Sequence, residues 1–284
     1  MLREGCFAIC VGTLRHFAKF RAIIIQSLAI AAAGAPFVPS GYAARSQAVG
    51  QRDVTHSWYS GQVMFTEDYV LRMINQAVAA LFKIIGLKKA GDYQEAQQAI
   101  DQALEQLLGL RADIIKRLDE ESLLKALTQQ GRLDIERLEL IADLFKEEGD
   151  ILAAQSRISE SRESYLRSLI YHLETGFGET TQPSVELTGE IERLVQNLGA
   201  QDLPDDTLWA LFCYYEQTGA YSKADDAIRK MAGRPNLYAN IHPELVAFYE
   251  RLLERPTGEL AEGVIDREQV EHKLEKAKQN NSHK

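Results

Sequence analysis

The sequence has little cysteine. Three cysteines occur among 284 residues: Cys6 and Cys10 lie near the N-terminus, and Cys213 stands alone in the rest of the chain. A lone cysteine cannot form a disulfide within that part, and this usage is typical of a reducing compartment. We therefore expect a cytoplasmic protein. The two N-terminal cysteines have no second pair or ligand cluster near them, so we predict no metal site there.

Long hydrophobic runs and an excess of basic residues are also lacking. The most apolar run starts at Ala22 and ends at Ala33. As a helix it would span ~18 Å, against the ~30 Å of a bilayer core, which argues against a membrane-spanning segment. The chain has 41 acidic and 32 basic residues, a formal net charge of -9. An acidic chain binds phosphate backbones poorly, so we expect no nucleic-acid partner.

Catalytic and metal-binding motifs are missing as well. We find no Gly-x-Ser-x-Gly, phosphate loop, Gly-x-Gly-x-x-Gly or Cys/His arrangement of known spacing. Glu174 lies two residues from His172, but the Glu-x-x-His pairs of helical-bundle metal sites do not occur. The glycines of Gly176-Phe177-Gly178 follow a predicted helix and are interpreted as a linker. The sequence therefore predicts no catalytic residue, no metal and no cofactor.

Pairs of acidic residues are more readily explained by solvation than by chemistry. We expect them at helix ends or on outer faces, where water and helix dipoles stabilise the charges. The pairs concerned are Glu120-Glu121, Glu147-Glu148 and Asp225-Asp226.

The first 63 residues differ from the rest of the chain. They carry six basic and two acidic residues, a net charge of +4, which leaves -13 for the remainder. They also lack capped amphipathic segments, so we place a boundary at Met64, with a poorly ordered leader over residues 1–63. Three origins of the leader stay open: a start assigned too early, a secretory signal that would export the protein, and a membrane anchor. Pro36, directly after the small residues 33–35, argues against signal cleavage.

One pattern recurs three times after the leader. A glycine is followed by an alanine five residues later and an isoleucine nine residues later. The glycines are Gly91, Gly149 and Gly219, the alanines Ala96, Ala154 and Ala224, and the isoleucines Ile100, Ile158 and Ile228. Glycine can end a helix in the left-handed conformation, and a small alanine on the next helix lets two backbones approach closely. The pattern predicts three helical hairpins, and we expect Ala154→Leu to overpack the second.

These windows resemble the tetratricopeptide repeat. The matching residues are Gly91-Asp92-Tyr93 with Ala96, Gly149-Asp150-Ile151 with Ala154, and Gly219-Ala220-Tyr221 with Ala224. The resemblance implies antiparallel helix pairs that bind a protein or peptide without a cofactor. The glycines are 58 and 70 residues apart, whereas a regular array repeats every ~34. We therefore expect an all-α fold of irregular tetratricopeptide-like hairpins stacked as an α-solenoid over residues 64–256. The stretch from residue 65 to 110 also resembles an uncharacterised bacterial family, which implies no activity.

Further helices fill the intervals. Asp119, Asp134 and Ser184 are each suited to cap a helix N-terminus, and we expect the first of these helices to run to Gln130. Pro204 and Pro243 fit first-turn positions. Irregular connections are predicted around residues 176–183 and 257–264, with a linker and a polar C-terminal helix over 257–284. No alternating pattern predicts a strand.

Two surfaces are candidates for partner binding. The segment from Leu208 to Tyr215 is apolar on all sides of a helix, so it is either buried between neighbours, the interpretation we favour, or presents Trp209 and Tyr214 to a partner. In the first hairpin, Arg72, Asn75 and Gln76 either line a groove for an extended peptide or simply form a solvated face.

The leading functional interpretation is a non-enzymatic scaffold or adaptor that binds a protein or peptide, or associates with itself. Two alternatives remain from the sequence. One is an all-helical enzyme whose residues meet only in three dimensions. The other is an exported or membrane-associated adaptor that uses the leader.

Overall fold

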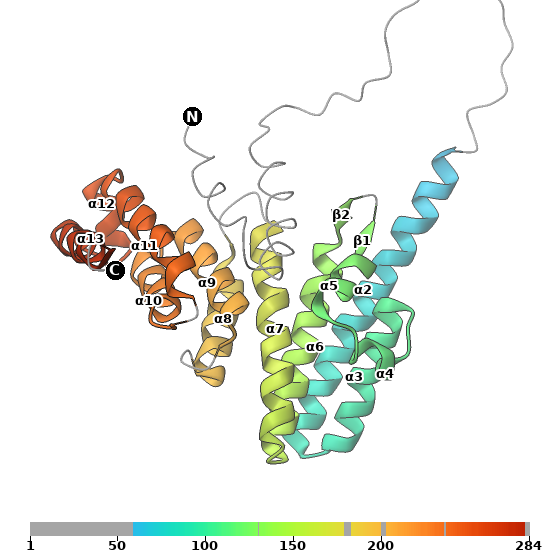
Figure 1. The fold of residues 1–284 in the computed structure, drawn as a ribbon. Coiled ribbons are helices and arrows are strands. Elements are labelled where there is room, and N and C mark those ends of the chain that lie inside the picture. Colours follow the sequence, from blue (N-terminus) through green and yellow to red (C-terminus); the bar gives the residue numbers. More distant parts are fainter. Residues whose placement is uncertain (1–58, 130, 179–182, 200–202, 236, 282–284) are drawn as a thin grey trace, which may run out of the picture.

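The computed structural model describes residues 59–281, except 130, 179–182, 200–202 and 236. This part of the chain is almost entirely helical, which confirms the all-α fold class (Figure 1). The elements are α2 (Tyr59–Ala90), α3 (Tyr93–Leu108), α4 (Ala112–Ile115), α5 (Glu120–Ala126), β1 (Thr128–Gln129), β2 (Arg132–Leu133), α6 (Ile135–Ala154), α7 (Ile158–Gly178), α8 (Val185–Leu198), α9 (Asp205–Thr218), α10 (Tyr221–Ala232), α11 (Tyr238–Leu253), α12 (Thr257–Glu262) and α13 (Arg267–Asn281). Cys6, Cys10 and the apolar run at 22–33 lie outside the described residues.

Helices α2 to α7 enclose a first hydrophobic core. On α3 the buried side chains recur every three or four residues and form one apolar face. They are Ala96, Ala99, Ile100, Ala103, Leu104 and Leu107. The three alanines among them let α2 and α3 approach closely. Helix α6 packs against both α2 and α3 and contributes Ile141 and Phe145 to the same core.

Helices α7 to α13 enclose a second core, rich in aromatic side chains such as Tyr214, Phe212 and Phe248. Figure 1 shows α8–α13 gathered on the side of α7 that faces away from α2–α5. Helix α7 belongs to both cores: Leu169 and Leu173 pack into the second, whereas Ile170 and Tyr171 pack into the first. It therefore forms the wall between them.

The helix starts follow the capping chemistry of the sequence. The carboxylate of Asp119 accepts a hydrogen bond from the Ser122 backbone N–H. Asp134 does the same for Arg137, and the hydroxyl of Ser184 accepts from Leu187. Each cap satisfies a backbone donor that the first helical turn leaves unpaired. The three predicted N-caps are confirmed.

Two of the three predicted hairpins are confirmed with the predicted glycine turn and buried alanine. Gly91 (φ 84°) and Gly219 (φ 79°) adopt the left-handed conformation at the turns between α2 and α3 and between α9 and α10. Ala96 and Ala224 are fully buried where the paired helices meet. The glycine supplies a backbone angle that other residues rarely adopt, and the alanine supplies the close approach.

The turn predicted at Gly149 is wrong, although α6 and α7 do pack against each other as a helical hairpin. Gly149 lies inside α6, which continues to Ala154, and the turn to α7 comes at Ser156 (φ 61°). Ala154 is exposed, and Ile158 is 67% exposed at the start of α7. Gly149 serves a different purpose: a Cβ there would lie 2.6 Å from the ring of Tyr165 on α7. Glycine at this position allows helices α6 and α7 to touch rather than ending α6.

Several other local predictions need correction. Helix α5 ends at Ala126 instead of Gln130, and the following residues form the two-residue antiparallel strands β1 and β2. Pro243 lies inside α11 and not in its first turn. The predicted connection at 257–264 contains α12, and Gly176 belongs to α7, where a Cβ would lie 2.8 Å from the Tyr214 ring. At 257–264 and at Gly176, tertiary packing overrides the local preference of glycine for turns.

Candidate functional site

The predicted partner-binding residues lie in two different environments. Arg72, Asn75 and Gln76 are all exposed on α2. Tyr214 is 1% exposed, and its hydroxyl lies 3.1 Å from the hydroxyl of Thr188. Trp209 is partly buried and packs against the second core. Burial of α9 is therefore the correct interpretation, and Tyr214 does not belong to an exposed binding surface.

Helix α2 has two opposite faces. Met73, Ala77 and Ile84 are buried against the neighbouring helices. On the other side, Phe82 is 73% and Val78 37% exposed, and exposed Asn75 lies one turn before Val78. Phe82 is the largest of the exposed hydrophobic side chains in the described part of the chain. Phe82 and Val78 are one helical turn apart, so this face of α2 presents two neighbouring apolar side chains beside polar ones.

A cluster of charged residues joins α6 to its neighbours, and the sequence analysis missed it. Lys88 at the end of α2 lies 2.5 Å from a carboxylate oxygen of Glu147 and 2.5 Å from one of Asp150. The hydroxyl of Tyr165 donates a hydrogen bond to the other oxygen of Asp150 at 2.7 Å. These contacts connect α2, α6 and α7.

Glu148 makes an equivalent contact on another side of α6. Lys116, which follows α4, lies 2.6 Å from Glu148 and 2.5 Å from Asp101 of α3. Ser164 of α7 donates a hydrogen bond to the second oxygen of Glu148. Glu147 and Glu148 are both buried, so their predicted place on an outer face is wrong. A buried carboxylate is tolerated only when a cation and hydrogen-bond donors satisfy it, and each glutamate has them.

Asp225 repeats this arrangement in the second core. It is buried on α10, where the Tyr249 hydroxyl of α11 donates a hydrogen bond to it at 2.5 Å. Lys273 of α13 lies 2.7 Å from its other oxygen. The expectation of a solvated acidic pair at Asp225-Asp226 is therefore wrong for Asp225. Each buried acid ties together helices that are distant in the sequence.

Helix α7 also carries buried titratable groups without such partners. His172 is 2% exposed, and neither of its ring nitrogens has a hydrogen-bond partner in the described part of the chain. Burial lowers the pKa of His172 to about 4; Glu190 opposes this shift, and Lys146 adds to it. The Nε2 atom lies 3.7 Å from Asp143, too far for a hydrogen bond. His172 is therefore neutral at physiological pH.

Glu174 and Asp143 show the opposite shift. Glu174 is 3% exposed, and burial raises its pKa to about 7. Burial also raises the pKa of Asp143 to about 6, while Lys146 opposes this and neighbouring carboxylates add to it. Such shifted values are common in active sites. His172 and Glu174, however, are two residues apart on one helix and therefore project in different directions, and both are closed to solvent.

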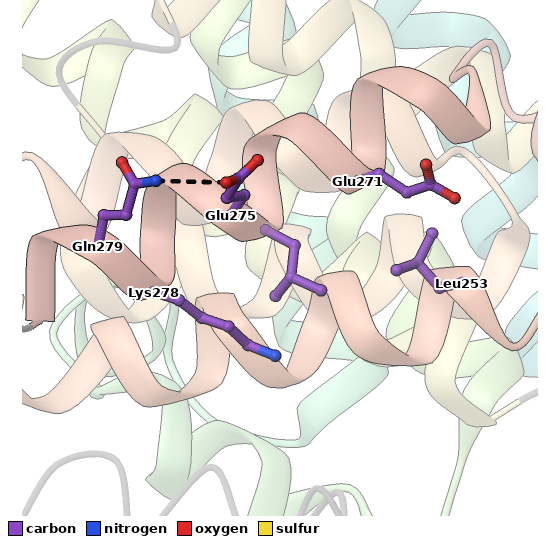
Figure 2. Close-up of a pocket in the computed structure, with 6 residues that line it drawn as sticks. Leu253, Glu271, Glu275, Lys278 and Gln279 are labelled. Atoms are coloured by element: carbon purple, nitrogen blue, oxygen red, sulfur yellow. Dashed lines mark hydrogen bonds between the residues drawn. The ribbon is translucent and has the colours of Figure 1, made fainter.

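An open groove of about 450 Å³ lies between α11 and α13. Figure 2 shows the side chains that line it, with the amide of Gln279 donating a hydrogen bond to Glu275. The lining consists of Leu253, Glu271, Leu274, Glu275, Lys278 and Gln279. None of the predicted binding residues and none of the unpaired α7 groups lines this groove.

No group of three or more His, Cys, Asp or Glu side chains in the described part of the chain has an arrangement that can bind a metal ion. None of the helices there is both long and apolar enough to cross a membrane.

The chain was also compared with known proteins. Neither the curated proteins nor the solved structures include a match. A family model does match, over residues 64–282, and it describes a family of unknown function. Because these residues are more than half of the chain, the protein belongs to the family of unknown function DUF6483.

Proposed function

We propose that this protein is a non-enzymatic scaffold that binds a protein or peptide partner through helix α2. Its helical hairpins are of an irregular tetratricopeptide-like type, stacked as an α-solenoid. Two observations support this architecture: the hairpins at Gly91 and Gly219 share their turn and their buried alanine, and helices α6 to α13 lie across the molecule in approximately chain order (Figure 1). Cys213 is the single cysteine after the leader, and this usage favours a cytoplasmic location.

The exposure of Phe82 carries this proposal. Its ring is 73% exposed on a helix whose opposite face is buried, so the fold itself does not need an aromatic residue there. The ion pairs of Lys88 hold the end of this helix rigidly against α6. A rigid helix can bind a partner at a low cost in conformational entropy. Helix α2 would do so with the ring of Phe82 and the side chains of Arg72, Asn75 and Gln76.

An enzyme is the second candidate, supported by the shifted pKa values of His172, Glu174 and Asp143. A general acid or base must reach its substrate within hydrogen-bond distance. His172 and Glu174 are almost fully buried, whereas the open groove lies on α11 and α13. The scaffold proposal explains the exposed surface of α2. The buried titratable groups of α7 would then affect the stability of the fold and not a reaction.

The experiment is a comparison of two triple variants in affinity purification from the native organism. Arg72→Ala, Asn75→Ala and Gln76→Ala together remove the polar side chains of the α2 surface. The control replaces three exposed glutamines of α3, Gln94, Gln98 and Gln102, by alanine. We expect copurifying chains, including untagged copies of this protein, to be lost with the α2 variant and retained with the control. Equal recovery with both variants, or no copurifying chain with the wild type, would contradict the proposal.

The same purification tests the exported alternative. Mass spectrometry of the recovered protein identifies its N-terminal peptide. A mature terminus directly after residues 33–35 would support export through a cleaved signal. A peptide from residues 1–30 would show that the leader is retained.

A further inference from the structure

Three helices bring charged side chains together around His172 of α7. This helix packs against both α6 and α8 and lies between them (Figure 1). Asp143 and Lys146 come from α6, and Glu190 comes from α8. Lys146 lies 2.8 Å from a carboxylate oxygen of Glu190 and 3.3 Å from one of Glu147. The cluster therefore lies at the wall between the two cores, because α6 belongs to the first core and α8 to the second.

Asp143 differs from the other carboxylates of this cluster because it has no cation of its own. Glu147 pairs with Lys88, and Glu190 pairs with Lys146. Within the described part of the chain, no lysine or arginine forms an ion pair with Asp143. A half-buried carboxylate that lies near other carboxylates and lacks a cation is stabilised by binding a proton.

His172 offers an acceptor for that proton. Its ring is 2% exposed, and both ring nitrogens lack hydrogen-bond partners among the described residues. Its Nε2 atom lies 3.7 Å from Oδ1 of Asp143, about 1 Å beyond hydrogen-bond length. A neutral imidazole has one bare nitrogen that accepts a hydrogen bond, and leaving it unpaired in the interior costs free energy. A protonated Asp143 can donate its O–H to this nitrogen after a small side-chain movement.

The electrostatics of the cluster agree with this assignment. Burial raises the pKa of Asp143 to about 6; Lys146 opposes the shift, and Glu139, Glu190 and Glu147 add to it. Burial lowers the pKa of the facing imidazole to about 4, so the ring stays neutral while the carboxyl titrates. The carboxyl and the imidazole together hold one proton between these two pH values, and the carboxyl carries it.

We propose that Asp143 and His172 form a proton-dependent latch between α6 and α7, in which one proton closes a hydrogen bond from the Asp143 carboxyl to Nε2 of His172. The proton enters from solvent, because the side chain of Asp143 is 32% exposed. Its uptake also removes the negative charge that Asp143 presents to Glu190 on α8. The latch therefore tightens the wall between the two cores in weakly acidic solution, whichever partner α2 binds.

The first test follows the ring of His172 in the full chain. Nitrogen-15 labelling of the histidines gives ring signals that distinguish a bare nitrogen, a hydrogen-bonded nitrogen and an imidazolium. The signals of His172 are those lost in His172→Gln. We expect its Nε2 to change from bare to hydrogen-bonded as the pH falls through about 6, and the ring to stay neutral until about pH 4.

Two aspartate variants locate the proton. The amide of Asp143→Asn can donate to Nε2 at every pH, so the ring nitrogen should be hydrogen-bonded throughout, with no step near pH 6. Asp226→Asn changes an exposed aspartate on α10 and should keep the wild-type step. A ring that shows no step near pH 6, or that becomes an imidazolium there, overturns the latch. A step that persists in Asp143→Asn overturns it as well.

The second test compares the melting temperatures of the same proteins. The raised pKa of Asp143 means that the folded state keeps a proton that an unfolded aspartate, with its ordinary pKa of 3.8, releases. The wild type therefore loses stability relative to Asp143→Asn as the pH rises from about 4 to about 6. We expect the melting temperature of Asp143→Asn to gain on that of the wild type through this range and to keep a constant lead above it. Asp226→Asn should follow the wild type, and a lead of Asp143→Asn that does not change with pH would overturn the proposal.

Discussion

Gly149 and Gly189 are both glycines inside helices, but they meet different surroundings. A Cβ at Gly149 would lie 2.6 Å from the Tyr165 ring, whereas nothing lies within 4 Å of a Cβ at Gly189. We expect Gly149→Ala to lower the free energy of unfolding by about 1–3 kcal/mol, because the ring must move. Gly189→Ala should leave it unchanged or raise it by up to ~1 kcal/mol, because alanine favours the helix. Urea denaturation measures both, and equal effects would contradict this placement of α6 against α7.

Glu174 should make stability depend on pH. The folded pKa of about 7 lies above the ordinary glutamate pKa of 4.5, so the folded state retains a proton that the unfolded state releases. The free energy of unfolding therefore falls as pH rises from about 4.5 to about 7. Glu174→Gln should remove this loss and make the variant about 2–3 kcal/mol more stable than the wild type near pH 8.

The control for this variant is Glu163→Gln, an exposed glutamate on the same helix. It should show the wild-type pH dependence. His172 has the opposite effect, because its folded pKa of about 4 lies below the ordinary histidine pKa of 6.5. With His172, the free energy of unfolding falls as the pH falls from about 6.5 to about 4. His172 is present in all three proteins, so the comparison isolates Glu174. Parallel curves for wild type and Glu174→Gln would contradict the burial of this carboxyl.

Helix pairs provide a direct test of the repeat. Ala96 is fully buried and Ala154 is exposed, although both follow a glycine by five residues. We expect Ala96→Leu to lower the free energy of unfolding by about 1–3 kcal/mol through overpacking. Ala154→Leu should change it by less than about 0.5 kcal/mol, contrary to the prediction from sequence. Thermal or urea unfolding distinguishes the two, and a large effect at Ala154 would contradict its exposed position.

The contact between α2 and α6 depends on Lys88. Replacing it by methionine leaves the buried Glu147 without its closest cation. We expect Lys88→Met to cost about 2–4 kcal/mol of stability, and the added change Glu147→Gln to recover most of this loss. Lys83→Met, at an exposed position of the same helix, should have little effect. A double variant no more stable than Lys88→Met would show that the ion pair is not the source of the loss.

The sequence predicted the helices better than the contacts between them. Caps at Asp119, Asp134 and Ser184 are local, since the side chain and its backbone partner lie three residues apart. Gly149 was misassigned because glycine both ends helices and permits close helix contacts, and local sequence does not separate these roles. The buried Glu147, Glu148 and Asp225 were placed outside because their lysine partners come from distant helices.

The candidate site was predictable only in part. Arg72, Asn75 and Gln76 are exposed on α2 as expected, but an all-apolar helix such as α9 gives no local sign of which residues remain accessible. Tyr214 is buried because α7 and α8 cover it, with Gly176 admitting its ring. The exposure of Phe82 becomes recognisable only once the opposite face of α2 is known to be buried.

The C-terminal segment is part of the second core and not a loosely attached helix. Val270 of α13 is fully buried, and Lys273 pairs with Asp225. We expect Val270→Ala to lower the free energy of unfolding by about 1–3 kcal/mol through loss of buried surface and a residual cavity. The matched change Val185→Ala, at a strongly exposed position of α8, should be neutral. Unfolding followed by tryptophan fluorescence of Trp209 measures the effect on this core, and no loss from Val270→Ala would contradict the docking of α13.

Helix α7 has a consequence for which changes of length the chain can accept. Neighbouring residues on it serve different cores, Leu169 one and Ile170 the other. Insertion of a single residue near the middle of α7 would rotate all that follows by ~100°, so side chains intended for one core would face the other or solvent. A comparable insertion at a surface turn would leave both cores in register. Across the protein's relatives, α7 should therefore keep a constant length even where its individual residues differ.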